Sequence, residues 1–259
     1  CALPIYDDHW PVLFYLNQPR VATNHYGYLD NIPKHFKLYS DPIINGFVQS
    51  GANMFCLSES IKYTYRALGV PDELLFVTHN GARKDLITFR KESLFPDKSI
   101  YLARICERKQ QHLYQSINCI DFVGNVDSNS YDFNKGFDLK KPNYIGSWNK
   151  KNLYDQITNY SNLVLLSDGE ADPLVTKEAL MAGLGVVVSE RASANLDKMP
   201  FIDVIPSSKM NDINYVEEII KKNQEISNQM RNEIREYAIE KFDYDNVVDR
   251  YIKTIENII

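Results

Sequence analysis

Two glutamates, Glu170 and Glu178, stand eight residues apart where the sequence predicts a loop followed by a helix. The apolar run over residues 162–167 is typical of a buried strand. Asp172 is a favoured helix N-cap and Pro173 suits the first helical position, so Glu170 falls in the loop and Glu178 inside the helix. A helix start attracts anions through its free N–H groups. Because the carboxylates could accept hydrogen bonds from hydroxyl groups, this segment predicts a site for a nucleotide sugar.

The residues after Glu178 complete a strand–helix–strand unit. Gly183 fits the position just past a helix end, and residues 186–189 are again apolar and β-branched. Two strands joined by so short a helix should be parallel neighbours with a right-handed crossover. Ligands of such sheets bind at the carboxyl ends of the strands, which is where Glu170 is expected.

Two basic residues could bind the phosphates of such a ligand. Arg104 ends a predicted strand over residues 100–105, and Lys109 lies at the start of the next predicted helix, over residues 108–115. A forked guanidinium and an ammonium group suit a diphosphate. The alternative is that these are surface charges that pair with Glu107, and for Arg108 this alternative is preferred.

The remaining polar residues give weaker signals. His25 ends a predicted strand over residues 19–25 and would face the same cleft, although a purely structural histidine is the alternative. Asp243 and Asp245 lie between two predicted helices and are interpreted as helix caps rather than metal ligands. The other histidines show no metal-site spacing: His9, His35, His79 and His112. The chain has no GxGxxG, no Gly-Lys-Ser/Thr phosphate loop and no HExxH, which argues against dinucleotide oxidoreductases, ATPases and zinc hydrolases.

The composition is typical of a soluble globular protein. The chain has 259 residues, of which 44% are hydrophobic and 24% charged, and its net charge of -5 argues against a nucleic-acid partner. No apolar run is long enough to span a bilayer. The four cysteines form no CxxC pair and are expected to be buried reduced thiols, which indicates a cytoplasmic protein. The chain begins without Met and without a signal peptide, and we expect it to be a fragment that lacks its first strands.

Strand and helix patterns alternate along the chain, which predicts an α/β fold with parallel sheets. Two doubly wound units are expected, with the polar segment 91–98 as a hinge between them. The predicted divisions are a partial first domain at 1–92, a second domain at 93–242 and a C-terminal helix at 243–259 that packs back towards the first domain. A single helix is expected over residues 215–241 and a polar loop over residues 127–141. The cleft between the two units is the expected ligand site.

Together these residues resemble the retaining, nucleotide-sugar-dependent glycosyltransferases of family 4, which have the two-domain glycosyltransferase-B fold. Glu170 and Glu178 match the family's Glu-x7-Glu motif, and Ala179-Leu-Met-Ala-Gly-Leu-Gly-Val-Val-Val-Ser matches the segment after it. Arg104 to Lys109 matches its phosphate element, with Ala103 in place of a glycine. Residues 57–81 resemble the end of the family's first domain, and residues 144–162 the segment before the motif. The four segments occur in the family's order.

The resemblance implies two tandem Rossmann-like domains, the first on the acceptor side and incomplete, the second binding the donor. It implies that Arg104 and Lys109 bind the departing phosphates, Glu170 the donor-sugar hydroxyls and Glu178 the ribose. The other donor-binding residues that it implies are Pro173, Leu174, Val175, His25, Gly146 and Trp148. No metal and no cofactor are expected.

The chain also departs from the family pattern. Ala171, Asp172 and Pro173 stand where the family usually has Gly-Phe-Gly, and a proline has no N–H to donate, so the sugar pocket is expected to be altered. The family's glycine-rich acceptor-side loop is missing from this sequence. The resemblance places that loop in a preceding region, which could also make a peripheral membrane contact.

The implied activity is transfer of a hexosyl group from a nucleoside-diphosphate sugar to a hydroxyl of a glycan, lipid or protein, with retention of configuration. Two alternatives stay open at this point. One is an epimerase or hydrolase of nucleotide sugars on the same fold. The other is a subunit that binds sugar nucleotides without catalysis.

Overall fold

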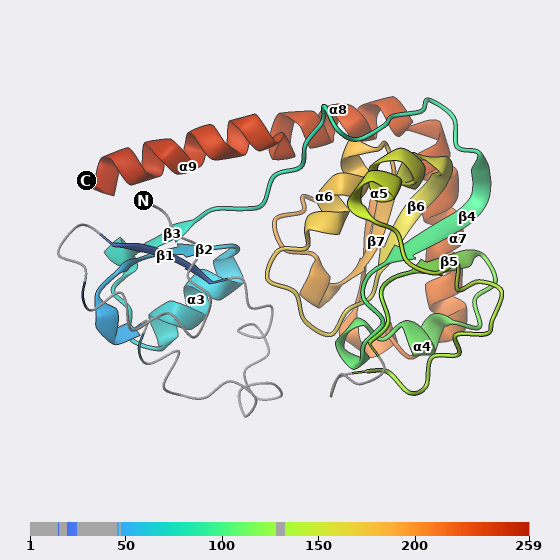
Figure 1. Ribbon diagram of the computed structural model, residues 1–259, viewed down its shortest axis with the longest axis horizontal. Coiled ribbons are helices and arrows are strands. Elements are labelled where there is room, and N and C mark those ends of the chain that lie inside the picture. Colours follow the sequence, from blue (N-terminus) through green and yellow to red (C-terminus); the bar gives the residue numbers. More distant parts are fainter. Residues whose placement is uncertain (1–14, 16–19, 25–45, 47, 128–132, 259) are drawn as a thin grey trace.

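A computed structural model describes residues 15, 20–24, 46, 48–127 and 133–258, and it consists of two α/β parts (Figure 1). The smaller part contains a parallel sheet of order β1-β2-β3, formed by β1 (Val21–Asn24), β2 (Asn53–Cys56) and β3 (Leu75–Val77). Helix α3 (Glu59–Ala67) begins at Ser58, whose hydroxyl accepts from the Ile61 N–H, and it packs on β2 and β3. The alternation of strand and helix expected for the first domain is therefore present.

The larger part is built on a five-stranded parallel sheet of order β5-β4-β6-β7-β8. Its strands are β4 (Phe95–Leu102), β5 (Ile120–Val123), β6 (Tyr160–Leu165), β7 (Gly185–Ser189) and β8 (Ile202–Ile205). Every residue of β6 and β7 is buried, as expected of central strands covered on both faces. Because β6 and β7 pair in parallel with Leu163 opposite Val186, the predicted strand–helix–strand unit is confirmed.

In the described residues from 95 onward, six α-helices lie between the strands of this sheet or after its last strand: α4 (Gln111–Tyr114), α5 (Lys150–Gln156), α6 (Leu174–Met181), α7 (Ile213–Gln229), α8 (Arg231–Phe242) and α9 (Tyr244–Ile258). Helix α6 is the crossover between β6 and β7. Gly183 has φ +81° just past its end, so the predicted glycine terminator is confirmed. The two parallel sheets with their helices confirm the predicted α/β class.

Several predicted elements differ from the structure. The segment 91–98, expected as a hinge, includes the start of β4 at Phe95 and Pro96, next to a register shift in the pairing of β4 with β6. The single helix expected over 215–241 is two helices that meet at Met230. The helix expected from Arg108 to Gln115 is a 3₁₀ turn over Glu107–Lys109 followed by α4, with the left-handed Gln110 (φ +53°) between them.

Helix α9 runs along the smaller part after crossing from the larger one (Figure 1). The ring of Tyr251 packs on Phe55 of β2 with centroids 4.4 Å apart, and Ala82 forms a parallel bridge with Asp243. The boundaries of the three predicted domains remain predictions. In the chain as far as it is described, no helix has the length and apolar character required to cross a membrane.

The buried apolar residues that the structure describes form two clusters, one around each sheet. Ala171, from the loop between β6 and α6 of the larger part, belongs to the cluster of the smaller part. That loop therefore contacts both parts, and its position sets the geometry of the site.

Candidate functional site

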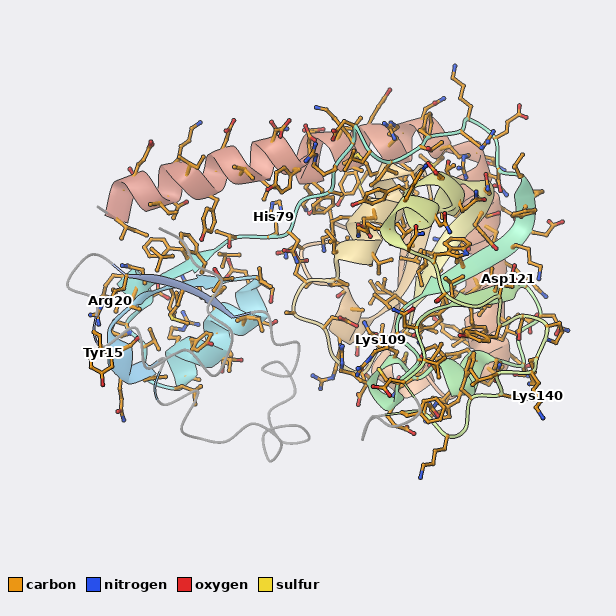
Figure 2. All side chains as sticks on the ribbon, viewed as in Figure 1. Tyr15, Arg20, His79, Lys109, Asp121 and Lys140 are labelled. Atoms are coloured by element: carbon orange, nitrogen blue, oxygen red, sulfur yellow. The ribbon has the colours of Figure 1, made fainter. Side chains whose placement is uncertain are left out.

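Glu170 is the centre of a charged cluster in the loop between β6 and α6. Its side chain is 10% exposed. The ammonium of Lys109 forms an ion pair with Oε1 of Glu170, and the Arg108 guanidinium lies 3.2 Å from the same oxygen. Arg108 also donates to the Gly169 carbonyl, and its own carbonyl accepts from the Asp168 N–H at 2.8 Å. Figure 2 labels Lys109 beside the five-stranded sheet. The structure therefore brings the predicted pair Lys109 and Glu170 together.

Opposite charges determine the protonation of this cluster. Burial by itself would raise the pKa of Glu170, but the attraction of Lys109 and Arg108 outweighs it, so the pKa lies below its ordinary value. Burial lowers the pKa of Lys109, and Glu170 offsets part of that effect. The carboxylate is therefore ionised at neutral pH, and two cations lie beside it.

A cleft of about 360 Å³ opens next to this cluster, between the two parts. The smaller part contributes Leu57 and Asn80, and the larger part contributes Arg108 and the segment 170–174. Leu174 is the first residue of α6 and is exposed, so the amino end of this helix borders the cleft. Among the described lining residues, Arg108 is the cation, and the carboxylates of Glu170 and Asp172 are paired with Lys109 and Lys177. An arginine beside a helix start is a favourable environment for a phosphate.

Asp172 is not the N-cap that the sequence predicts. The N-cap position of α6 belongs to Pro173, which makes no side-chain cap hydrogen bond. The Asp172 carboxylate instead pairs with the Lys177 ammonium, and both side chains are 0% exposed. Its second oxygen accepts from the Asn80 N–H at 2.6 Å, while the Asn80 side chain donates to the Asp172 carbonyl at 2.7 Å. Asp172 therefore joins the loop of the larger part to the smaller part.

Glu178 lies one turn into α6, and its side chain is only 3% exposed. It forms an ion pair with Lys150 at the start of α5, and the Lys150 ammonium lies 5.0 Å from the Tyr154 ring centroid. Burial raises the pKa of Glu178, and Lys150 offsets only part of that rise. The second glutamate of the pair is thus a buried carboxyl group and not a solvated surface residue.

The other predicted residues fall into different places. Pro173 and Leu174 line the cleft, and Val175 follows them half-buried in α6. Gly146 has φ +90° and its carbonyl accepts from Gly124, just past the carboxyl end of β5. Trp148 turns its ring towards Tyr160 at the start of β6, with centroids 6.3 Å apart, so it packs away from the Glu170 loop. His25 lies outside the described residues.

The two arginines have different surroundings. The Arg104 side chain is exposed, and Arg104 is not among the described residues that line the cleft. Arg108, interpreted as a surface partner of Glu107, is half-buried against Glu170 instead. Its place next to Lys109 was the signal available in the sequence.

Two further polar residues were not singled out by the sequence. Lys150 neutralises Glu178, and Asn80 holds Asp172. In the described part of the chain, no group of three or more His, Cys, Asp or Glu side chains is arranged to hold a metal ion.

No family model and no curated protein matches the sequence. Solved structures do match. Anabaena HepE in complex with UDP-glucose superimposes with a TM-score of 0.77 at 13% identity, over 97% of this chain and 77% of that chain. Sucrose-phosphate synthase from Thermosynechococcus elongatus gives a TM-score of 0.77 at 14% identity, over 96% and 70%. TarM gives 0.67 at 14% identity, over 95% and 53%. These neighbours are glycosyltransferase-B proteins, and the chain described here has the glycosyltransferase-B fold.

Proposed function

We propose that this chain is a glycosyltransferase that uses a nucleoside-diphosphate sugar as its donor. The observation that carries the proposal is the pairing of Glu170 with Lys109 and Arg108 at the edge of a cleft that also includes the start of α6. Support comes from neighbours of the same fold, among them HepE with UDP-glucose and the pneumococcal O-GlcNAc transferase GtfA with UDP and GlcNAc. UDP-sugars are therefore the first donors to test.

The charges at the cleft suggest how a donor would bind. A diphosphate would compete with Glu170 for Lys109 and Arg108, because its charge is larger than that of a carboxylate. Glu170 would then be available to accept hydrogen bonds from the hydroxyls of the donor sugar. Glu178, near the same helix start, is the proposed partner of the ribose hydroxyls, as the family resemblance implies.

The transfer step needs stabilisation of the leaving group. The bond between the sugar's anomeric carbon and the diphosphate oxygen breaks with its electron pair on the diphosphate. The oxygen of an acceptor hydroxyl forms the new bond to the anomeric carbon, and its proton passes to the diphosphate. Lys109, Arg108 and the N–H groups at the start of α6 would stabilise the negative charge that develops. Retention of configuration and transfer of a hexose are proposed from the resemblance.

We further propose that the reaction needs no metal ion and no cofactor, because fixed cations border the proposed phosphate site. Activity that is unchanged by EDTA and by added Mg²⁺ or Mn²⁺ would agree with this. Activity restored only by a divalent cation would contradict it.

Calorimetric titration with UDP, GDP and their common hexose conjugates tests the proposal. Lys109→Met should weaken nucleotide binding by about tenfold or more, since it removes a charge-assisted hydrogen bond from a dry site. Lys140→Met is the matched control, because Lys140 is exposed and lies far from Lys109 in Figure 2. Equal binding by wild type and Lys109→Met, or no nucleotide binding at all, would refute the proposal.

Product analysis separates transfer from the alternatives. The proposed enzyme should form a glycosylated acceptor only when an acceptor is added. Release of free sugar or of an epimerised donor without acceptor would indicate a hydrolase or an epimerase instead.

A further inference from the structure

A second cavity, of about 510 Å³, shares Glu170 with the donor cleft. The smaller part contributes Ser58, Glu59 and Ser60 at the start of α3. The larger part contributes residues between Glu190 and Asn195, which follow β7, and Ser207, which follows β8. The Asn195 side chain donates to the Leu57 carbonyl at 2.7 Å and so joins the two walls. Because Glu170 borders both spaces, ligands that occupy both would meet at this residue.

The walls of this cavity differ in charge from those of the donor cleft. Glu59 and Glu190 are exposed carboxylates on opposite walls, and Arg191 is the only cation among the described lining residues. Glu190 accepts from both the N–H and the hydroxyl of Ser207, which lowers its pKa and keeps it ionised. The charge of Glu170 is already balanced by Lys109 and Arg108.

The start of α3 does not make this cavity an anion site. The Ser58 hydroxyl already accepts from the Ile61 N–H at 3.4 Å, and Glu59 adds a carboxylate to the first turn. Apart from Arg191 and Asn195, the polar side chains among the described lining residues are hydroxyls and carboxylates. They include the hydroxyl of Ser60, which hydrogen-bonds with that of Ser58, and the hydroxyl of Ser193, which donates to the Glu190 carbonyl. Such groups hydrogen-bond neutral polyols well and repel phosphates.

We infer that this cavity binds the acceptor, and that the acceptor is an unphosphorylated carbohydrate whose reacting hydroxyl lies next to Glu170. The inference rests on the proposed function, since it assigns the second substrate of that same reaction. It divides the site between two substrates: the cleft beside Arg108 and the start of α6 takes the nucleotide sugar, and the cavity with the exposed Glu59 and Glu190 takes a neutral polyol. The acceptor hydroxyl would reach the anomeric carbon across Glu170 and pass its proton to the departing diphosphate.

Binding of simple sugars in the presence of saturating UDP tests this directly. Dissociation constants would be measured by saturation-transfer NMR for methyl glucoside, methyl galactoside and methyl mannoside, and for the corresponding hexose 6-phosphates. Wild-type protein should bind at least one neutral glycoside about tenfold or more tightly than its phosphorylated counterpart, because the phosphate would face Glu59 and Glu190.

A charge reversal shows whether the preference arises in this cavity. Glu59→Lys should reduce the preference for the neutral glycoside at least threefold by attracting the phosphate. Glu73→Lys makes the same change at an exposed residue of the same part that does not line the cavity, and it should leave the ratio unchanged.

The outcomes distinguish this inference from the proposed function. Three results would each overturn the acceptor assignment and leave the donor assignment intact. The 6-phosphates could bind as tightly as the neutral glycosides or more tightly, Glu59→Lys could leave the ratio of the two dissociation constants unaltered, or no glycoside could bind while UDP binds. If wild-type protein binds no nucleotide, the proposed function itself fails.

Discussion

The ionic contacts of single residues decide how this site could work. Glu170 and Lys109 could be predicted from the sequence, because Glu170 follows an apolar strand in a loop and Lys109 lies at the start of the predicted helix after another strand. The role of Arg108 could not, because its approach to Glu170 is a contact between segments distant in sequence. The ion pair between Lys150 and the buried Glu178 was equally hidden, since it depends on where α5 lies relative to α6.

The two arginines can be distinguished by experiment. Arg108→Gln should weaken binding of a UDP-sugar about tenfold, since Arg108 borders the cleft and the Glu170 carboxylate. Arg104→Gln should have a smaller effect, because the Arg104 side chain is exposed. The comparison is made by calorimetry on both variants. A larger loss for Arg104→Gln would return the phosphate role to Arg104 and make Arg108 a structural residue.

Glu178 should make stability depend on pH. Burial raises its pKa above the ordinary value of 4.5. Below pH 4.5 both folded and unfolded states hold the proton, but at higher pH the unfolded state releases it first, so the free energy of unfolding falls. Glu178→Gln has no such proton, so its stability relative to wild type should improve as pH rises from about 4 to about 8. Urea denaturation across this range measures the difference, with the exposed Glu225→Gln as control. A difference that is constant with pH would contradict the raised pKa.

At the scale of elements, the sequence located most strands but misjudged where helices begin and end. The predicted helix over 215–241 breaks at Met230 because Arg231 turns inward and donates to the carbonyls of Tyr160 and Thr158 at 3.0 and 2.7 Å. An arginine normally marks an exposed helix face, so apolar spacing alone could not show this break. The predicted start of α6 was wrong for a similar reason. The Asp172 carboxylate pairs with Lys177 and accepts from the Asn80 N–H instead of capping the helix.

The Asp172–Lys177 pair should be strongly coupled. Asp172→Asn should destabilise the protein by about 3–5 kcal/mol, since it leaves the fully buried Lys177 ammonium without its counter-charge. The double variant Asp172→Asn/Lys177→Met should lose less than the sum of the two single variants. Chemical denaturation of all four proteins gives the coupling energy. Additive losses would show that the ion pair does not hold this loop.

At the scale of the whole molecule, helix α9 connects the two parts. The sequence predicted a terminal helix that packs back. Its contacts include the Tyr251 ring on Phe55 and the hydrogen bond between Arg250 and His79, which no pattern in a single sequence reveals. Two further hydrogen bonds join the smaller part to the larger part, one between Asn80 and Asp172 and one between Asn195 and Leu57. The cleft geometry therefore depends on contacts between segments that are distant in sequence.

Removing the ring tests that connection. Tyr251→Ala should lower the free energy of unfolding by about 1 kcal/mol or more and expose α9 to limited proteolysis, because the aromatic contact with Phe55 is lost. Ile252→Ala is the control, since Ile252 is 46% exposed on the same helix. Equal cleavage rates in the two variants would mean that Tyr251 does not hold the helix in place.

The central claim is that Glu170 exchanges Lys109 for the hydroxyls of the donor sugar when a nucleotide sugar binds. Calorimetric titration of wild type and Glu170→Gln with UDP and with the tightest-binding UDP-sugar tests it most directly. Glu170→Gln should bind UDP at least as tightly as wild type, because Lys109 is released, but it should lose the additional affinity that the sugar provides. A variant that binds UDP more weakly while keeping the sugar's contribution would contradict it.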